Sequence, residues 1–209
     1  MILIENIEIY GWEAAVRGAR NPMNSWSKLD SHYNSDGKFI LGDNDIDLLK
    51  RLSNAGNDHG KFMRMIGVTM DVTAPLYYWK EADQYKVGTT TNSCSTMHKI
   101  HSKRFEIEDF STEHLTPLSV QTLKEVLRIM NIEREDFLKT KNKERWWQMI
   151  QLLPSSYNQT RTWCLNYAVL KNIYHARKDH KLDEWKDFCK MIEKLPYSEL
   201  IIDGGNGNK

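Results

Sequence analysis

The first twenty residues join a strand pattern directly to a helix pattern, which is typical of folds that mix both elements. Isoleucines and a leucine alternate loosely with polar residues between positions 2 and 9, which predicts an opening strand. Residues 12–20 predict a short helix that ends before Asn21-Pro22, because the residue before a proline disfavours helical geometry. Residues 24–42 are then polar and rich in turn formers.

Three further elements are expected in the first half of the chain. Residues 43–45 (Asp-Asn-Asp) can cap a helix, and Gly56 would end it. Residues 62–73 predict a strand, which Ala74-Pro75 closes. Residues 76–84 predict a helix that begins directly after it, since a proline suits a first helical turn.

The second half is more helical. Apolar residues recur every three or four positions after Ser119, and a second such set runs up to Pro154. Two further long helices are expected over residues 160–177 and 182–195, with an elbow between them.

The composition fits one globular domain. Of the 209 residues, 40% are hydrophobic and 27% are charged, which is ordinary for a soluble protein. We expect a single domain over residues 1–202 with an α/β (α+β) fold, in which an antiparallel-to-mixed sheet is flanked by long helices. Residues 203–209 are rich in Gly and Asn and are expected to form a flexible tail.

Charge and cysteine content limit the partners and the compartment. The formal net charge of +1 gives no field of the kind that non-specific nucleic-acid binders use, so nucleic acid is not indicated. Three widely spaced cysteines form no disulfide framework, and reduced intracellular thiols are the simplest account. No apolar run reaches the roughly 18 residues of a membrane span, and the first one is too short for a signal peptide. We therefore expect a cytoplasmic protein with no membrane partner.

The most distinctive polar segment is residues 88–96, which directly follow an aromatic stretch. Seven of these nine residues are Thr, Ser or Asn, so the segment offers many short donors and acceptors and little apolar surface. It can be a binding site or an ordinary polar loop, and composition alone leaves both open. Cys94, with His98 four residues on, could act as a nucleophile, but an ordinary cysteine among polar neighbours is the simpler interpretation.

Common metal and phosphate motifs are not found. His98 and His101 lie three residues apart, but no HExxH pattern and no acidic residue at ligand spacing accompanies them, so no metal site is expected. Gly37-Lys38 and Gly60-Lys61 are each followed by Phe, so neither completes a phosphate-binding loop.

The order of several features resembles the flavin-dependent thymidylate synthases. A strand ending in Ala74-Pro75 is followed by a helix, by Thr90-Thr-Asn92-Ser-Cys-Ser95, by Leu153-Pro154, and by a helix that carries Asn166, Asn172 and Arg177. The segment from His180 to Ile192 also resembles the closing helix of that family. The resemblance runs from Asn44 to Leu200 and implies the fold of that family.

This resemblance also implies ligands and the residues that hold them. It implies an FAD cofactor, NADPH and methylenetetrahydrofolate as co-substrates, and a pyrimidine nucleotide such as dUMP. The positions that correspond to flavin contacts are Lys86, Asn166 and Asn172, and side-chain amides suit the donor and acceptor edge of a flavin. The positions that correspond to nucleotide contacts are Gln84, Asn92, Ser95 and Arg177. No catalytic side chain is assigned, and the implied assembly is a homotetramer.

The spacing on the expected helix bears on that assembly. On an ideal helix Asn166 and Arg177 lie about 20° apart, whereas Asn172 lies about 120° from Asn166. One ligand on one subunit would not reach all three side chains. Sites assembled between subunits, which the family's tetramer implies, would account for them.

The chain also departs from the family pattern. Gln84-Tyr85-Lys86 stands where the family has Arg-His-Arg, Met97-His98 stands where it has Arg-Tyr, and Ile150 replaces a further arginine. Lys86 keeps the charge of a guanidinium but not its planar fork, so phosphate affinity is expected to fall unless other cations compensate. The candidates for that compensation are Arg20, Arg64, Lys80 and Lys86.

Three functions therefore remain open. The first is a flavin-dependent thymidylate synthase-like enzyme, in which the protein orients ligands for reductive one-carbon transfer to C5 of the pyrimidine. The second is a catalytically inactive protein on the same fold that binds a nucleotide or a protein partner, which the lost arginines favour. The third is a related enzyme that modifies a pyrimidine in another way.

Overall fold

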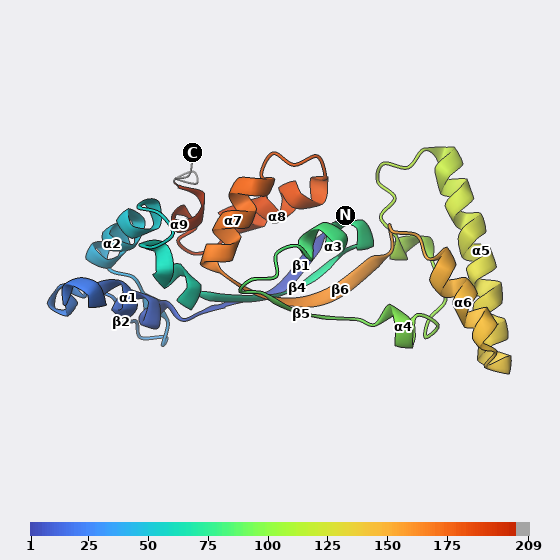
Figure 1. The fold of residues 1–209 in the computed structure, drawn as a ribbon, viewed down its shortest axis with the longest axis horizontal. Coiled ribbons are helices and arrows are strands. Elements are labelled where there is room, and N and C mark those ends of the chain that lie inside the picture. The colour runs from blue at the N-terminus through green and yellow to red at the C-terminus, as the bar shows by residue number, and fades with distance from the viewer. Residues whose placement is uncertain (204–209) are drawn as a thin grey trace. The chain divides into compact units, whose positions relative to one another are not determined.

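A four-stranded antiparallel sheet with the order β1-β4-β6-β5 forms the framework of the computed structural model, which describes residues 1–203 (Figure 1). Its strands are β1 (Leu3–Tyr10), β4 (Gly67–Pro75), β6 (Asn158–Asn166) and β5 (Thr90–Ser93). The chain divides into two compact units, and each of the four strands contributes residues to both. The expected antiparallel-to-mixed sheet with flanking helices is thus confirmed, and a single domain over residues 1–202 stays a prediction.

The first unit consists of residues 1–4, 72–84 and 92–162. Its helices are α3 (Leu76–Ala82), α4 (Thr96–Lys99), the 3-10 turn η4 (Ile107–Asp109), α5 (Pro117–Thr140) and α6 (Lys143–Leu152). The two longest helices, α5 and α6, pack against each other (Figure 1). Both contribute to a core of buried apolar side chains that also includes residues before them, namely Ile100, Phe105, Phe110, Leu123, Leu127, Met130 and Met149.

Local sequence explains where α5 begins and ends. The Thr116 side chain accepts a hydrogen bond from the backbone N–H of Ser119, and Pro117 occupies the first turn, where its missing N–H costs nothing. The helix ends at Lys141, whose φ of 56° is left-handed. Asn142 then caps α6 by accepting from the backbone N–H of Glu144, so only two residues separate the helices.

The second unit consists of residues 5–71, 85–91 and 163–203 of the described chain. It contains α1 (Trp12–Arg20), η1 (Asn21–Met23), η2 (Trp26–Lys28), α2 (Asp43–Asn54), η3 (Gly60–Met65), α7 (Tyr167–Arg177), α8 (Asp183–Glu193) and α9 (Glu199–Ile202). A small antiparallel hairpin joins β2 (His32–Tyr33) to β3 (Phe39–Ile40) within the stretch that the sequence indicated only as turns.

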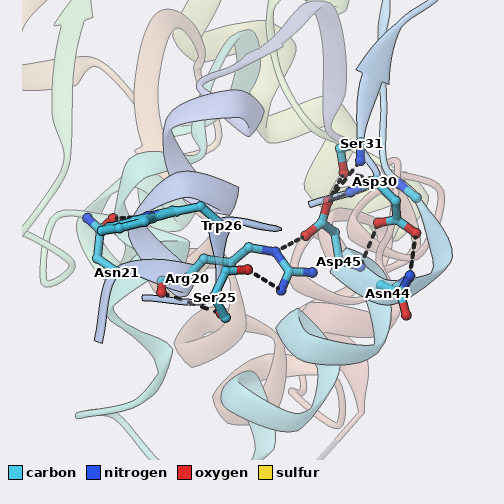
Figure 2. Close-up of polar contacts among 9 residues, drawn as sticks. Arg20, Asn21, Ser25, Trp26, Asp30, Ser31, Asn44 and Asp45 are labelled. Carbon is cyan, nitrogen blue, oxygen red and sulfur yellow. Dashed lines mark hydrogen bonds and ion pairs between the residues drawn. The ribbon is translucent and has the colours of Figure 1, made fainter. Parts of the chain in front are cut away.

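A buried ion pair ties α1 to α2 in the second unit (Figure 2). The Arg20 Nε donates to Asp45 Oδ1 at 2.5 Å, and the two side chains are 3% and 0% exposed. The other carboxylate oxygen of Asp45 accepts from the backbone N–H and the hydroxyl of Ser31, at 2.9 and 2.6 Å. Paired and hydrogen-bonded in this way, the two charges can be buried without an isolated ion in the core.

The same contacts correct the expected cap of α2. Residues 43–45 do not cap the helix themselves, because the cap comes from Asp30 outside it (Figure 2). The Asp30 carboxylate accepts from the backbone N–H groups of Asn44 and Asp45, at 2.9 and 3.1 Å. Asp45 is thereby left to pair with Arg20.

Two expected element boundaries were wrong. The strand expected over residues 62–73 begins only at Gly67, because Gly60–Met65 forms a 3-10 helix. The long helix expected over residues 160–177 is strand β6 followed by α7. Trp163 and Leu165 are buried with period two, and the β-branched Thr160 and Thr162 suit a strand, so this pattern outweighs the helical one.

The polar segment 88–96 is also more regular than a loop. Thr90–Ser93 forms the terminal strand β5 of the sheet, and the backbone N–H of Cys94 extends that pairing by donating to the Thr160 carbonyl at 3.0 Å. A row of exposed hydroxyl and amide side chains suits an edge strand. Residues 204–209 of the expected tail lie outside the described residues.

No helix within residues 1–203 combines the length and the apolar character that a membrane crossing requires.

Candidate functional site

The residues expected to bind ligands divide between the two units. Gln84, Asn92 and Ser95 belong to the first unit, and Lys86, Asn166, Asn172 and Arg177 belong to the second. In the second unit, Asn166 caps α7 and Asn172 and Arg177 lie on this helix.

Arg177, the last residue of α7, is held by two aromatic side chains. Its Nε donates to the Tyr85 hydroxyl at 2.9 Å. Its guanidinium carbon lies 5.1 Å from the centre of the Trp185 ring and 5.7 Å from that of Tyr85. Cation–π contacts on two rings and a hydrogen bond fix the plane of the guanidinium, which is what two-point recognition of a phosphate requires.

Asn166 lies at the other end of α7, where it acts as the N-cap. Its amide oxygen accepts from the backbone N–H of Val169 at 3.0 Å, and its Nδ2 donates to the Gly88 carbonyl at 3.4 Å. An asparagine amide has two N–H groups, so one of them remains for a ligand. The cap has an extended backbone, with φ of −143°, so the expected angle of about 20° between Asn166 and Arg177 does not apply.

The segment from Tyr85 to Gly88 therefore contacts both ends of α7. Tyr85 meets the last residue of the helix and Gly88 meets its N-cap. Gly88 has a φ of +75°, and a Cβ at this position would lie 3.1 Å from Asn166 Nδ2 and 3.3 Å from Val169 Cγ2. Only glycine combines this backbone with so close an approach.

Two other candidates in the second unit have uncommitted side chains. Lys86 and Asn172 are exposed, and neither forms a side-chain hydrogen bond or ion pair with any residue between 1 and 203. Lys86 lies in the segment 85–88, which contacts α7, and Asn172 lies on α7 itself. They keep their full capacity to donate to a ligand.

The three candidates in the first unit are Gln84, which follows α3, Asn92 on β5, and Ser95, which caps α4. Ser95 is the N-cap of α4 and accepts from the backbone N–H of His98 at 3.0 Å, so its own hydroxyl hydrogen is still free to donate. Asn92 lies on β5 with an exposed side chain. The Gln84 Nε2 donates to the Glu81 carbonyl at 2.8 Å, which uses one of its two amide hydrogens.

Sequence reasoning missed a set of contacts that supports this region of the first unit. Arg161 forms an ion pair with Asp83 at 2.6 Å and stacks on Trp79, with 4.3 Å from the guanidinium carbon to the ring centre. Gln159 accepts from Arg161 at 3.1 Å and donates to the Cys94 carbonyl at 2.7 Å. Arg161 was hidden in the stretch expected to be a helix, and the alternation of β6 could have pointed to it.

The cations proposed to compensate for the missing arginines differ in availability. Arg20 was a wrong candidate, because it is buried and paired with Asp45 in the core. Arg64 and Lys80 are exposed and have no ion-pair partner among residues 1–203, so their role stays a prediction. No group of three or more His, Cys, Asp or Glu side chains in that range is arranged to hold a metal ion.

The fold is that of the flavin-dependent thymidylate synthases. The chain is similar over 98% of its length to the flavin-dependent thymidylate synthase ThyX of Helicobacter pylori, solved with FAD and dUMP, with a TM-score of 0.67, 16% identity and 99% of that chain covered. A second structure of this enzyme with FAD and dUMP gives a TM-score of 0.65 at 16% identity, with 97% of each chain covered.

A methylase has a similar fold. The UMP/dUMP methylase PolB of Streptomyces cacaoi, bound with 5-Br dUMP, gives a TM-score of 0.62 at 14% identity and covers 98% of this chain and 96% of its own. No protein-family model matches the chain. No curated protein matches its sequence either. The sequence has thus diverged strongly, while the expected fold is confirmed.

Proposed function

We propose that this chain binds FAD and a pyrimidine nucleotide of the dUMP type and catalyses reductive one-carbon transfer to C5 of the pyrimidine. The observation that carries the proposal is the fixed guanidinium of Arg177, at the position that the resemblance assigns to the nucleotide. Support also comes from the fold, since similar structures contain FAD and dUMP.

The available donors fit a flavin. Asn172, Lys86 and the remaining N–H of Asn166 would hold it, since each retains hydrogen-bonding capacity beside α7. When bound, a reduced flavin supplies hydride, and methylenetetrahydrofolate supplies the one-carbon unit while NADPH supplies the reducing equivalents. The side chains of this protein bind and orient the ligands and need not attack them.

A nucleotide would be held by its phosphate and its base. Arg177 offers a planar charge to the phosphate, and the Ser95 hydroxyl and the amides of Asn92 and Gln84 offer neutral hydrogen bonds. We include in the proposal a homotetramer in the cytoplasm, with sites assembled from more than one subunit. In such an assembly, residues of different subunits can serve one ligand.

A second candidate is a protein that binds a nucleotide without catalysis. Tyr85 stands where the family has a histidine, and its hydroxyl is committed to Arg177. With Gln84 and Lys86 on either side, this segment lacks both guanidinium forks of the family motif. A third candidate, an enzyme that modifies a pyrimidine in another way, draws support from the similarity to the UMP/dUMP methylase.

Absorbance of the purified protein separates these candidates at the first step. A flavoprotein shows the flavin bands as isolated or after incubation with FAD, whereas a colourless protein that takes up no FAD overturns both enzymatic proposals. With flavin present, tritium release from C5-labelled dUMP in the presence of reductant and methylenetetrahydrofolate supports thymidylate synthesis. A flavoprotein that binds dUMP and releases no tritium contradicts thymidylate synthesis and leaves the second and third candidates.

The Arg177→Ala variant tests the nucleotide site itself. Loss of a charge-assisted contact to phosphate is expected to weaken dUMP binding by about tenfold or more. Lys178→Ala is the matched control, because it removes a cation at the next, exposed position. Equal dUMP affinity of the Arg177→Ala variant and the native protein would contradict the assignment.

A further inference from the structure

The first unit contains a cavity of about 380 Å³ that is widely open to solvent and that the proposed function does not use. It lies where α4 and the residues after it face the connection between α5 and α6. None of the residues expected to hold flavin or nucleotide lines it. Its volume falls in the range of small-molecule sites in proteins, which begins at about 300 Å³.

Aromatic side chains form its walls. The ring of His101 packs edge-on against Phe137, with 4.9 Å between the ring centres. Trp146 is half-buried, and its indole N–H donates to the Met97 carbonyl at 3.3 Å, so the orientation of the ring is fixed. Fixed aromatic walls favour a ligand with a planar ring, which can stack or pack edge-on against them.

Two lysines give the cavity a positive charge. Lys141 and Lys143 flank the connection between α5 and α6, and both line the cavity. Neither has a carboxylate partner among residues 1–203, whereas Arg145 in the first turn of α6 is paired with Glu133 and Asp136. The lining includes no acidic side chain. The Lys141 ammonium lies 5.6 Å from the centre of the Phe137 ring, so the two lysines place positive charge beside the aromatic wall, where it attracts an anion.

His101 adds a polar atom that lacks a partner. Its Nδ1 is buried and forms no hydrogen bond with any residue in the described chain. Burial and the nearby charges of Lys141 and Lys99 lower the pKa of His101, so the ring is neutral at pH 7 and can accept or donate one hydrogen bond. Buried polar atoms without partners are rare in proteins because they cost stability. Nδ1 has no exposed surface, so a ligand in the cavity does not reach this atom, and His101 contributes its ring as part of the wall.

We propose that this cavity binds a small anion that carries a planar ring, with the ring against Phe137 and Trp146 and the anionic group on Lys141 and Lys143. The anionic group is a phosphate or a carboxylate, since an ammonium group pairs with either. None of the cavity's lining residues is assigned to the proposed flavin and nucleotide site, and Met97 and His98 lie two and three residues after Ser95.

Titration of the full chain with phenyl phosphate and with benzoate tests the proposal. The indole N–H signal of Trp146 in a ¹H–¹⁵N spectrum is expected to shift with saturation for at least one of them, and the tighter ligand identifies the anionic group. Phenol lacks the charge and inorganic phosphate lacks the ring, so both are expected to bind more weakly. If neither aromatic anion shifts the Trp146 signal, the proposal is overturned.

Variants locate the binding. Lys141→Gln and Lys143→Gln are each expected to weaken the aromatic anion by about tenfold, because each removes one charged contact. Lys139→Gln is the matched control, since this exposed lysine lies in the last turn of α5 and does not line the cavity. Arg177→Ala is a second control, and it is expected to leave binding unchanged. Affinity that is insensitive to both cavity lysines, or that depends on Arg177, overturns the assignment to this cavity.

Discussion

The Tyr85 hydroxyl accepts a hydrogen bond from Nε of Arg177 at 2.9 Å, although the two residues are 92 positions apart in sequence. Tyr85 stands where the family motif has a histidine, whereas Arg177 matches the family pattern, so the contact joins a changed position to a retained one. In the proposed nucleotide site Tyr85 is a positioning residue that acts through Arg177, and this role can be separated from general stability.

Replacing Tyr85 by Phe keeps the ring beneath Arg177 and removes only the hydrogen bond. The free energy of unfolding is expected to fall by about 1 kcal/mol, and dUMP affinity by about fivefold, because the guanidinium is less firmly oriented. Tyr174→Phe is the matched control, because Tyr174 lies on α7 with Arg177 and its hydroxyl donates a hydrogen bond to Glu193 at 2.9 Å. That control should lose similar stability and no dUMP affinity. Urea unfolding and calorimetric titration measure the two effects, and equal dUMP affinities of both variants would sink the positioning role.

The buried pair of Arg20 and Asp45 makes a prediction about stability. Arg20→Ala leaves the Asp45 carboxylate buried without its cation, so the free energy of unfolding is expected to fall by about 3–5 kcal/mol. Arg17→Ala on the same helix breaks an exposed pair with Glu13, which stabilises the fold by less than about 1 kcal/mol. Urea unfolding of the two variants compares them directly. Similar losses in both would show that the buried pair does not stabilise the fold as inferred.

The same carboxylate predicts how stability depends on pH. Burial alone would raise the pKa of Asp45, but the hydrogen bonds from Ser31 and Arg20 outweigh burial and hold its pKa below the ordinary value. A carboxyl with a lower pKa in the folded chain contributes stability that is complete above its unfolded pKa of about 4. This stability is lost as the pH falls through the folded pKa.

The comparison with Asp45→Asn isolates that contribution. The difference in free energy of unfolding between the native protein and the variant is expected to stay constant from neutral pH to about pH 5 and to narrow below about pH 4. Urea unfolding at several pH values measures it. A difference that remains unchanged at about pH 3 would show that the pKa of Asp45 is not the source of the acid sensitivity.

Local patterns explain which parts of the fold could be predicted from the sequence. Helix α1 has the expected bounds, Trp12–Arg20, but Asn21 keeps helical dihedral angles and the chain continues into η1, so the α-helical hydrogen bonding ends because Pro22 lacks an N–H. Strand β6 was assigned to a helix because the apolar spacing of α7, which follows it directly, was extended backward. The register that buries Trp163 and Leu165 depends on the neighbouring strands, and a single sequence does not contain that information.

In the candidate site, too, some residues could be named from the sequence, whereas their tertiary partners could not. Asn166, Asn172 and Arg177 could be named from one stretch of sequence, because the resemblance gives their spacing. The partners that hold Asn166 and Arg177 could not, since Tyr85 and Gly88 reach α7 through tertiary packing. Arg20 was misjudged for the same reason, because nothing near it in sequence indicates that Asp45 neutralises it.

Gly88 allows a test of the contact between residues 85–88 and α7. Its φ of +75° and the φ of +72° at Gly37 strain any L side chain to a similar degree, by about 1–2 kcal/mol. A Cβ at Gly37 meets no atom within 4 Å, whereas one at Gly88 lies 3.1 Å from Asn166 Nδ2 and 3.3 Å from Val169 Cγ2. The difference between Gly88→Ala and Gly37→Ala therefore reports the close approach to α7, free of backbone strain.

We expect Gly88→Ala to lower the free energy of unfolding by about 1 kcal/mol more than Gly37→Ala, since the crowded Asn166 cap must shift. Displacing Asn166 also moves the amide proposed to hold the flavin, so FAD affinity should fall in Gly88→Ala alone. Urea unfolding and FAD titration of both variants provide the measurements. Equal stability losses in the two variants would mean that Gly88 does not pack against the Asn166 cap. A larger loss in Gly88→Ala with unchanged FAD affinity would support the packing and remove Asn166 from the proposed flavin site.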